Sequence, residues 1–251
     1  MANRDRDQRK AQLREARLEQ EAEAAAAERR QRMVKLGAAA VFAAIVIIAV
    51  AIVISQSGSD SGGGGSTSAA LLKGIPQKGT VLGDPAAPVK VLEYGDLQCP
   101  VCKEYSATVV ADLISGPVRR GEAKIEFVNW VIIGPQSVPA ARAALAAAKQ
   151  NRYWQFVDDF YANQGTENSG YITDSFLTDI AEQAGVPDLD KWNRDRDLPG
   201  LKAVIAAADR SAQRLGFTGT PSFAVQGANG TKPLGTPRSA AEIEAAIAQG
   251  G

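Results

Sequence analysis

The only two cysteines of this 251-residue chain, Cys99 and Cys102, lie three positions apart. They follow a strand-like run, Val89 to Tyr94, and they precede a helix-like run. The chain is therefore expected to place both thiols at the start of a helix. Unpaired backbone N–H groups and the helix dipole stabilise a thiolate at that position. The spacing predicts a redox-active dithiol in which Cys99 is the nucleophile and Cys102 is the resolving thiol.

A zinc site, a structural disulfide and a pair of inert core cysteines each account for the spacing less well. A zinc site needs four ligands, and the chain has no histidine and no second cysteine pair, so we expect neither a metal nor a cofactor. A structural disulfide between the two cysteines would close only a short loop and would constrain the unfolded chain little. Two inert core cysteines would not need a turn and Pro100 between them, whereas proline suits the first turn of a helix.

An uncharged apolar run at residues 36–54 is long enough to span a bilayer as a helix. Basic residues crowd its N-terminal side, and the first basic residue after it is Lys73. The positive-inside rule then predicts a cytoplasmic N-terminus, with everything after Ile54 outside the cytoplasm. A cleaved signal peptide is the alternative, with residues 49–51 as a possible cleavage site. The length of the run favours an uncleaved signal-anchor.

The composition divides the chain into four predicted parts. Residues 1–35 form a charged, helical cytoplasmic segment, residues 36–54 the transmembrane helix, residues 55–73 a Gly/Ser-rich linker and residues 74–251 one folded domain. Protein disulfides form and persist outside the cytoplasm, so the predicted location agrees with the predicted dithiol. The net charge of zero argues against nucleic acid as a partner.

The hydrophobic pattern of the domain predicts a mixed α/β fold. Strands are expected at 89–94, 124–131, 222–226 and 231–235, and helices at 100–114 (ending at Gly116-Pro117), 138–164, 173–184, 201–215 and 239–248. The block of helices at about 138–215 is expected to form an insertion or lid beside one shared sheet. Its aromatic cluster is expected to be core rather than a peptide-binding surface, and consists of Trp154, Phe156, Phe160 and Tyr161.

Three motifs together carry a family resemblance: G-D-P-A-A-P at 83–88, E-Y-G-D-L-Q-C-P-V-C at 93–102, and G-T-P-S-F at 219–223. With them, residues 83–248 resemble the DsbA-like branch of the thioredoxin superfamily, particularly its membrane-anchored Gram-positive and actinobacterial type. The resemblance implies a thioredoxin fold with an inserted helical subdomain, preceded here by the single transmembrane helix. It also implies an extracytoplasmic thiol:disulfide oxidoreductase.

The resemblance also implies roles for residues outside the dithiol. The bond between Thr220 and Pro221 is expected to be cis, to lie against the dithiol and to pair its backbone with a substrate peptide. Glu93 falls at the position of a buried acid that accepts the proton of Cys102. Strand alternation supports burial because it places Glu93 on the face of apolar neighbours, although a solvent-facing carboxylate is the alternative.

One departure from the family pattern leaves the direction of electron flow open. The best-known oxidases carry histidine between the cysteines, whereas this chain has Val101, so we expect a less acidic Cys99 and a weaker oxidant. The leading hypothesis is an oxidase of exported proteins that is recharged by a membrane partner, a DsbB-like protein or a vitamin K epoxide reductase homologue by resemblance. A membrane-tethered reductase or isomerase is one alternative. A tethered binding module or chaperone with an incidental disulfide is another.

Overall fold

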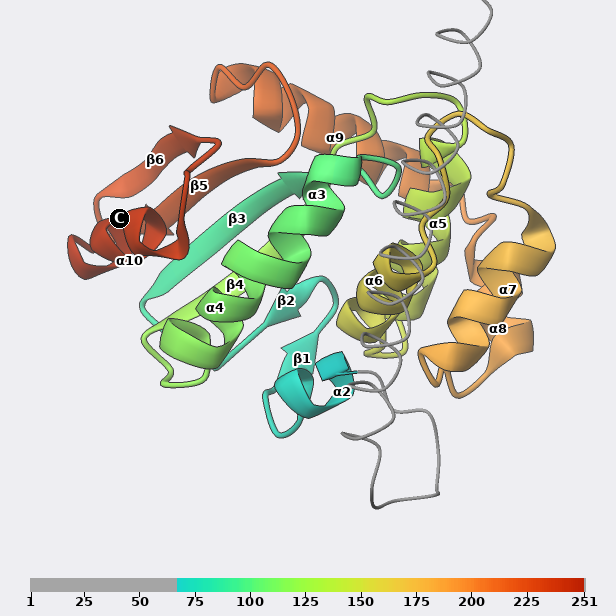
Figure 1. Cartoon of the computed structure of the whole chain (residues 1–251), viewed down its shortest axis with the longest axis horizontal. Coiled ribbons are helices and arrows are strands. Elements are labelled where there is room, and N and C mark those ends of the chain that lie inside the picture. The colour runs from blue at the N-terminus through green and yellow to red at the C-terminus, as the bar shows by residue number, and fades with distance from the viewer. Residues whose placement is uncertain (1–66, 251) are drawn as a thin grey trace, which may run out of the picture. The chain divides into compact units, whose positions relative to one another are not determined.

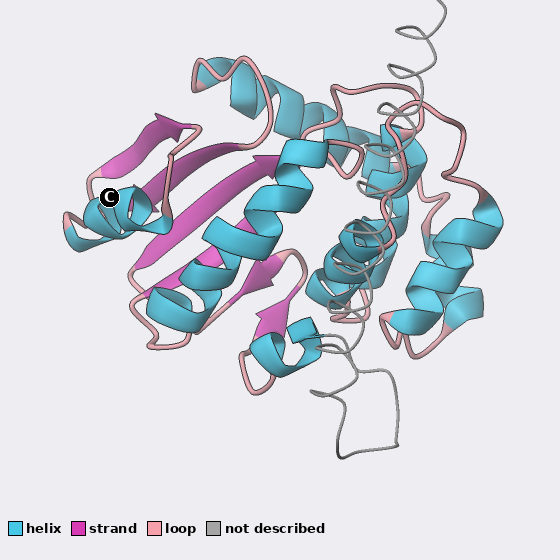
Figure 2. Ribbon diagram, viewed as in Figure 1, coloured by secondary structure: helices cyan, strands magenta, loops and turns pink. Residues whose placement is uncertain are grey.

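A six-stranded mixed sheet lies at the centre of the computed structural model, which describes residues 67–250 (Figures 1 and 2). The strand order is β1-β2-β4-β3-β5-β6. Central strand β3 runs parallel to β4 and antiparallel to β5. The bounds are Gln77–Lys78 for β1, Val81–Leu82 for β2, Val89–Gly95 for β3, Ala123–Asn129 for β4, Ser222–Gly227 for β5 and Gly230–Gly235 for β6. The four predicted strands are thus confirmed, and the two short strands at the β1 edge are additional.

A helical run connects β3 to β4 and crosses one face of the sheet (Figure 1). It consists of α3 (Pro100–Tyr105), a π-helical segment η1 (Ser106–Val110), α4 (Ala111–Leu113) and a second π-helical segment η2 (Ile114–Val118). The predicted break is present, because Gly116 has non-helical angles (φ −93°, ψ −111°). The predicted helix over 100–114 is therefore confirmed, although it contains π-helical turns and helical hydrogen bonding resumes past the kink to Val118. Pro117, which has no N–H, is accommodated there.

Five helices and no strand lie between β4 and β5 in the described chain, which confirms a helical insertion. They are α5 (Ser137–Ala148), α6 (Tyr153–Ala162), α7 (Asp174–Gln183), α8 (Leu189–Asp195) and α9 (Gly200–Arg214). The prediction of one helical stretch over 138–164 was wrong. Asn151 has a positive φ of 56° and separates α5 from α6. Helix α8 was not predicted; its N-cap is Asp188, whose side chain accepts a hydrogen bond from the Lys191 N–H.

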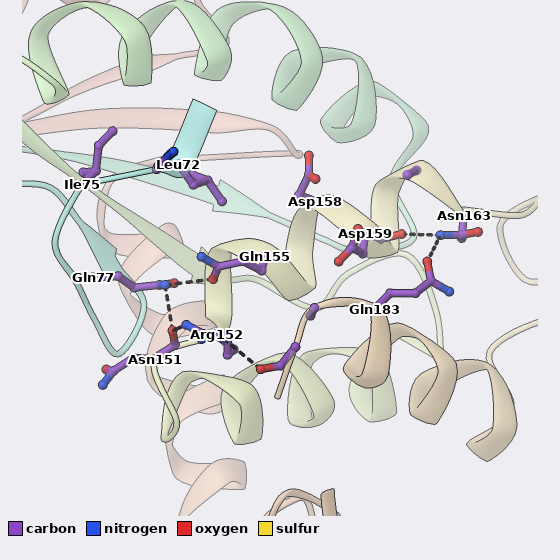
Figure 3. A pocket seen from close by; sticks show the side chains of 15 residues that line it. Leu72, Ile75, Gln77, Asn151, Arg152, Gln155, Asp158, Asp159, Asn163 and Gln183 are labelled. Carbon is purple, nitrogen blue, oxygen red and sulfur yellow. Dashed lines mark hydrogen bonds between the residues drawn. The ribbon is translucent and has the colours of Figure 1, made fainter. Parts of the chain in front are cut away.

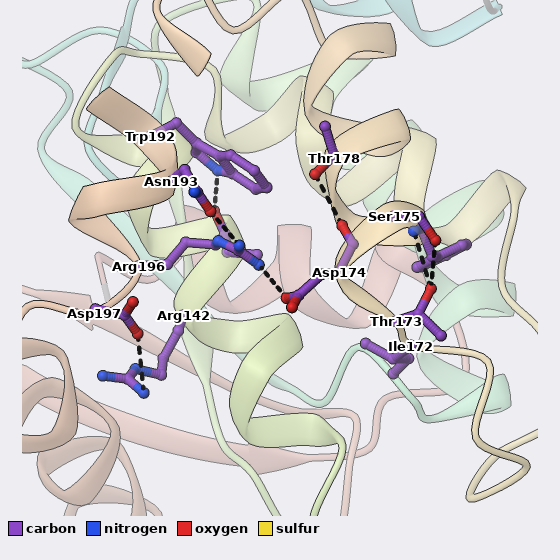
Figure 4. A network of polar contacts seen from close by, with 12 residues as sticks. Arg142, Ile172, Thr173, Asp174, Ser175, Thr178, Trp192, Asn193, Arg196 and Asp197 are labelled. Atoms are coloured by element: carbon purple, nitrogen blue, oxygen red, sulfur yellow. Dashed lines mark hydrogen bonds and ion pairs between the residues drawn. The ribbon is translucent and has the colours of Figure 1, made fainter. Parts of the chain in front are cut away.

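The insertion is held together by both apolar and polar contacts. The four aromatic residues of its predicted cluster are at most 4% exposed, which confirms that they are core. A polar network joins α7 and α8, where Arg196 forms an ion pair with Asp174 and lies over the ring of Trp192 (Figure 4). Asp174 is largely exposed, so the ion pair itself contributes little stability. Trp192 lies in α8 and Arg196 is the C-cap of the same helix, so packing on the ring holds the guanidinium group where it meets Asp174.

The two faces of the sheet are covered by different elements. The larger core lies between the sheet, the α3–η2 run, α10 (Ala240–Ala248) and the insertion. A smaller cluster on the other face packs Tyr94 of β3 against Trp130, Phe217 and Ala212 of α9. Because both faces of β3 are covered, every residue from Val91 to Cys99 is buried. The dithiol therefore follows one of the most enclosed strands of the fold.

The described chain starts with α2 (Thr67–Leu72), whose Leu72 is buried against the core. The fold thus begins inside the range predicted as linker, 55–73. The predicted transmembrane helix at 36–54 and the cytoplasmic segment at 1–35 lie outside the described residues. Within residues 67–250, no helix has both the length and the apolar character needed to cross a bilayer.

Candidate dithiol site

Cys99 is the N-cap residue of α3, and Pro100 occupies the first position of the helix. The Cys99 Sγ accepts a hydrogen bond from the Cys102 backbone N–H at 3.4 Å, and the Cys99 N–H donates to the Asp96 carbonyl at 2.9 Å. Both cysteines are free thiols and both are buried, Cys99 at 3% and Cys102 at 0% exposure. The structure therefore places the pair at the strand-to-helix junction that its spacing predicted.

The two thiols have opposite acidities. The pKa of Cys99 is lowered from 9.0 to about 6, chiefly by the hydrogen bond from the Cys102 side chain. Burial opposes this shift, whereas Thr220 and the backbone N–H groups of Cys102 and Val101 add to it. At neutral pH Cys99 is therefore mainly a thiolate. Its N-cap position supplies the backbone donors, as expected at a helix N-terminus.

Cys102 keeps its proton. Burial raises the pKa of Cys102 well above 9.0, and the hydrogen bond to Cys99 and the charge of Cys99 raise it further. The charge of Glu93 acts in the same direction. A thiolate beside a buried, protonated thiol is the arrangement expected for a nucleophile and its resolving partner.

Glu93 lies in β3, the strand that leads to the dithiol. It pairs with Phe127 of β4 and Phe223 of β5, and it is 1% exposed. The solvent-facing alternative is therefore wrong. Its Oε1 has no hydrogen-bond partner among the described residues, and desolvation by burial raises its pKa from 4.5 to about 8. At pH 7 this carboxyl group is mostly neutral, and when charged it raises the pKa of Cys102.

The Thr220–Pro221 segment lies on the other side of Cys99. Its peptide bond is cis. The Cys99 Sγ lies 3.5 Å from the Thr220 carbonyl oxygen, to which it donates a hydrogen bond when it is protonated. The Thr220 hydroxyl is buried without a hydrogen-bond partner among the described residues. Thr220 contributes to the low pKa of Cys99. The residues singled out from the two distant motifs are thus in contact.

Asp96 organises the dithiol loop, and the sequence reasoning missed it. One carboxylate oxygen accepts the Gln98 N–H at 2.9 Å, and the other accepts the N–H groups of Ile132 and Ile133, also at 2.9 Å. Asp96 is 2% exposed. It therefore ties the β3–α3 loop to the loop that follows β4. An aspartate directly after a strand and before a helix was the available signal, since such residues often bond nearby backbone N–H groups.

Two glutamines attach the insertion to the dithiol loop. The Gln98 side chain donates to Ser137 at 2.9 Å and accepts the Asn168 N–H at 3.0 Å. Gln164 donates to the Leu97 carbonyl at 2.8 Å and to the Cys99 carbonyl at 3.1 Å. Their partners are distant in sequence, so no local pattern indicated these roles.

A cavity of about 890 Å³ lies apart from the dithiol, and neither cysteine lines it (Figure 3). Polar side chains from β1, α6 and α7 surround it, and Asn163 bridges the Asp159 carbonyl and the Gln183 side chain. Burial, with the charge of Asp158 second, raises the pKa of Asp159 to about 6. Over residues 67–250, no group of three or more cysteine or acidic side chains is arranged to hold a metal ion.

The comparisons with known proteins agree with this geometry. The family model described as "Thioredoxin" matches residues 76–249. The "Probable disulfide bond formation protein D" of Bacillus cereus is 33% identical over 149 residues, which cover 58% of this chain and 69% of the relative. The "Disulfide bond formation protein D" of Bacillus subtilis is 27% identical over 158 residues, 61% of this chain and 68% of the relative.

Solved structures show the same fold. A thioredoxin-like oxidoreductase from Silicibacter pomeroyi is 31% identical with a TM-score of 0.55, and the alignment covers 70% of this chain and 91% of that one. Oxidised BdbD from Bacillus subtilis is 23% identical with a TM-score of 0.60, covering 70% and 96% of the two chains. The second likeness supports the fold alone.

Proposed function

The chain belongs to the DsbA-like branch of the thioredoxin family and is a thiol:disulfide oxidoreductase, and we propose that it introduces disulfides into exported proteins. The observation that carries this proposal is the opposite acidity of the two thiols, with a pKa of about 6 for Cys99 and a strongly raised pKa for Cys102. A stabilised Cys99 thiolate stabilises the reduced enzyme, and an enzyme with a stable reduced form is an oxidant.

The proposed reaction proceeds in two exchange steps. A substrate thiolate attacks Cys99 Sγ in the oxidised enzyme, the Cys99–Cys102 bond breaks, and Cys102 leaves as a thiolate. A second substrate thiolate then attacks the substrate sulfur of the mixed disulfide and releases Cys99 as a thiolate. The substrate loses two electrons, and the enzyme dithiol gains them.

Glu93 is the proposed proton donor and acceptor for Cys102. Its pKa of about 8 leaves it mostly protonated at pH 7, so it can protonate the departing Cys102 thiolate. In the return reaction its carboxylate takes the proton back when Cys102 resolves the mixed disulfide with the redox partner. Burial disfavours the carboxylate, so taking this proton back returns Glu93 to its favoured neutral form.

The Thr220–Pro221 segment is the proposed binding site for the substrate backbone. It lies beside Cys99, where the Thr220 carbonyl is 3.5 Å from the sulfur. A peptide pairing with this segment as an added strand would present its cysteine to Cys99. Val101, 43% exposed on α3, is available to contact the same peptide.

The reduction potential tests the direction of the reaction. The Cys99 pKa of about 6 lies between the roughly 3.5 of DsbA and the roughly 7 of thioredoxin. We therefore expect a potential between about −120 mV and about −270 mV, measured by equilibrating the full chain in detergent with glutathione buffers. Val101→His should raise the potential, because an imidazolium next to Cys99 stabilises its thiolate.

Val138→His is the matched control, since Val138 is also an exposed valine near a helix start but lies on α5. It should leave the potential unchanged. A potential at or below that of thioredoxin would assign the enzyme to the reductase alternative.

We further propose that the catalytic domain works outside the cytoplasm, anchored by residues 36–54, and that a membrane redox partner of the DsbB or vitamin K epoxide reductase type reoxidises it. The basic residues before the apolar run support this orientation. Alkaline phosphatase fused after Gly251 should be active, and β-galactosidase at the same position should be inactive. The reverse pattern would contradict both the orientation and the proposed substrates.

A further inference from the structure

The tripeptide Gly-Thr-Pro occurs twice near the C-terminus, at 219–221 and at 235–237. The first copy precedes β5 and contains the segment that contacts Cys99. The second copy begins at the last residue of β6 and has no part in the proposed exchange reaction. Because β5 and β6 are antiparallel and Phe223 pairs with Gly235, the two copies lie at the same end of the hairpin.

The second copy is bonded to both sides of the dithiol site. The Thr236 hydroxyl donates to the Pro221 carbonyl at 2.7 Å. The Tyr105 hydroxyl of α3 donates to the Pro237 carbonyl at 2.8 Å, and its ring stacks on Phe223 of β5. Residues 236 and 237 thus connect the helix that begins at Cys99 with the segment that lies against its sulfur.

The bond from Thr236 differs from the other bonds of the 219–221 segment. The Gly219 carbonyl accepts from Ser222, three residues away, and the Thr220 carbonyl accepts from Cys99 itself. The Pro221 carbonyl accepts instead from Thr236, which is outside both this segment and the dithiol. The position of this segment relative to α3 therefore depends on Thr236 and, through Pro237, on Tyr105.

We propose that Thr236 and Tyr105 are positioning residues that set the separation between Cys99 and the Thr220–Pro221 segment, and with it the groove that admits the substrate peptide. Neither residue is fully buried: Thr236 is exposed and Tyr105 is partly exposed. Removing one hydroxyl group therefore leaves the apolar core intact. The effect of removing the hydroxyl group is therefore expected at the dithiol site.

Thr236→Val keeps the shape of the side chain and removes the hydrogen bond. In the full chain we expect the pKa of Cys99 to rise from about 6 by about half a pH unit, because the Thr220 side chain, which lowers this pKa, moves away from the sulfur. The KM for oxidation of a dithiol peptide should rise about 3- to 10-fold, with kcat changed less than about twofold. Thiolate absorbance and stopped-flow fluorescence measure these quantities.

Thr236→Ser keeps a hydroxyl group at this position and should give the Cys99 pKa and the KM of the unmodified chain. Tyr105→Phe should shift both in the same direction as Thr236→Val, and the double variant should add little, because both bonds hold one segment. Thr231→Val is the matched control: Thr231 lies in β6, the strand that Thr236 follows, and its hydroxyl accepts only a 3.4 Å bond from exposed Gln226. It should behave as the unmodified chain.

The inference is overturned if Thr236→Val leaves both the Cys99 titration and KM unchanged, if Thr231→Val has the same effect, or if Thr236→Ser does not restore them. If Thr236→Val does not fold, Tyr105→Phe decides the question by the same two readouts. The titration of Cys99 does not depend on the direction of electron flow. A potential that favours the reductase would therefore leave this test valid.

Discussion

Cys99→Ser is expected to reduce thiol–disulfide exchange by at least roughly a thousandfold, whereas Cys102→Ser is expected to accumulate mixed disulfides with exported proteins. The reason is the division between the thiols: Cys99 is the N-cap thiolate with a pKa of about 6, and Cys102 is buried with its proton retained. Without Cys102, the disulfide between Cys99 and its substrate has no internal thiol to resolve it.

Non-reducing electrophoresis of cells expressing each variant measures the trapping. The variant lacking both cysteines is the control and should trap nothing. Equal trapping by the two single variants would contradict the assignment of Cys99 as nucleophile. Activity retained without either cysteine would favour the binding-module or chaperone alternative over the oxidoreductase.

The second large effect concerns stability and its dependence on pH. Because the pKa of Glu93 is about 8 in the folded chain against 4.5 ordinarily, the folded state binds more protons than the unfolded state between these values. The free energy of unfolding must therefore fall as pH rises from about 4.5 to about 8. At one pKa unit per 1.36 kcal/mol, Glu93 should lower it by about 3 kcal/mol between pH 5 and pH 8. Glu93→Gln should remove this decline.

Urea denaturation at pH 5 and pH 8 measures the effect. Cys99→Ser/Cys102→Ser is the suitable background, because it removes the titration of the two thiols. Glu126→Gln on β4 is the matched control, since its carboxylate is partly exposed and pairs with Lys90. Glu126→Gln should alter the difference in unfolding free energy between pH 5 and pH 8 by less than about 1 kcal/mol. If the free energy of unfolding fell equally between pH 5 and pH 8 in the chains with and without Glu93, the raised pKa of Glu93 would be contradicted.

Local sequence patterns predicted the elements that carry the dithiol. The alternation of Val89 to Tyr94 indicated β3, and Pro100 indicated the start of α3, because strand and helix-start signals are contained within a few residues. The alanine-rich run over 138–164 contained no comparable signal. Its division at Asn151 was therefore not predicted. The two-residue strands β1 and β2 depend on pairing with each other and with β4, and were missed for the same reason.

The sequence by itself determined the position, order and spacing of the two cysteines, and through the strand and the proline around them it determined that Cys99 begins a helix. Those properties follow from backbone geometry within one short segment. Only the tertiary structure decided how acidic the groups are and what Cys99 contacts. Thr220 is 121 residues from Cys99, and the desolvation of Glu93 comes from packing on both faces of the sheet. Burial and hydrogen bonding between such distant segments exist only once the chain has folded.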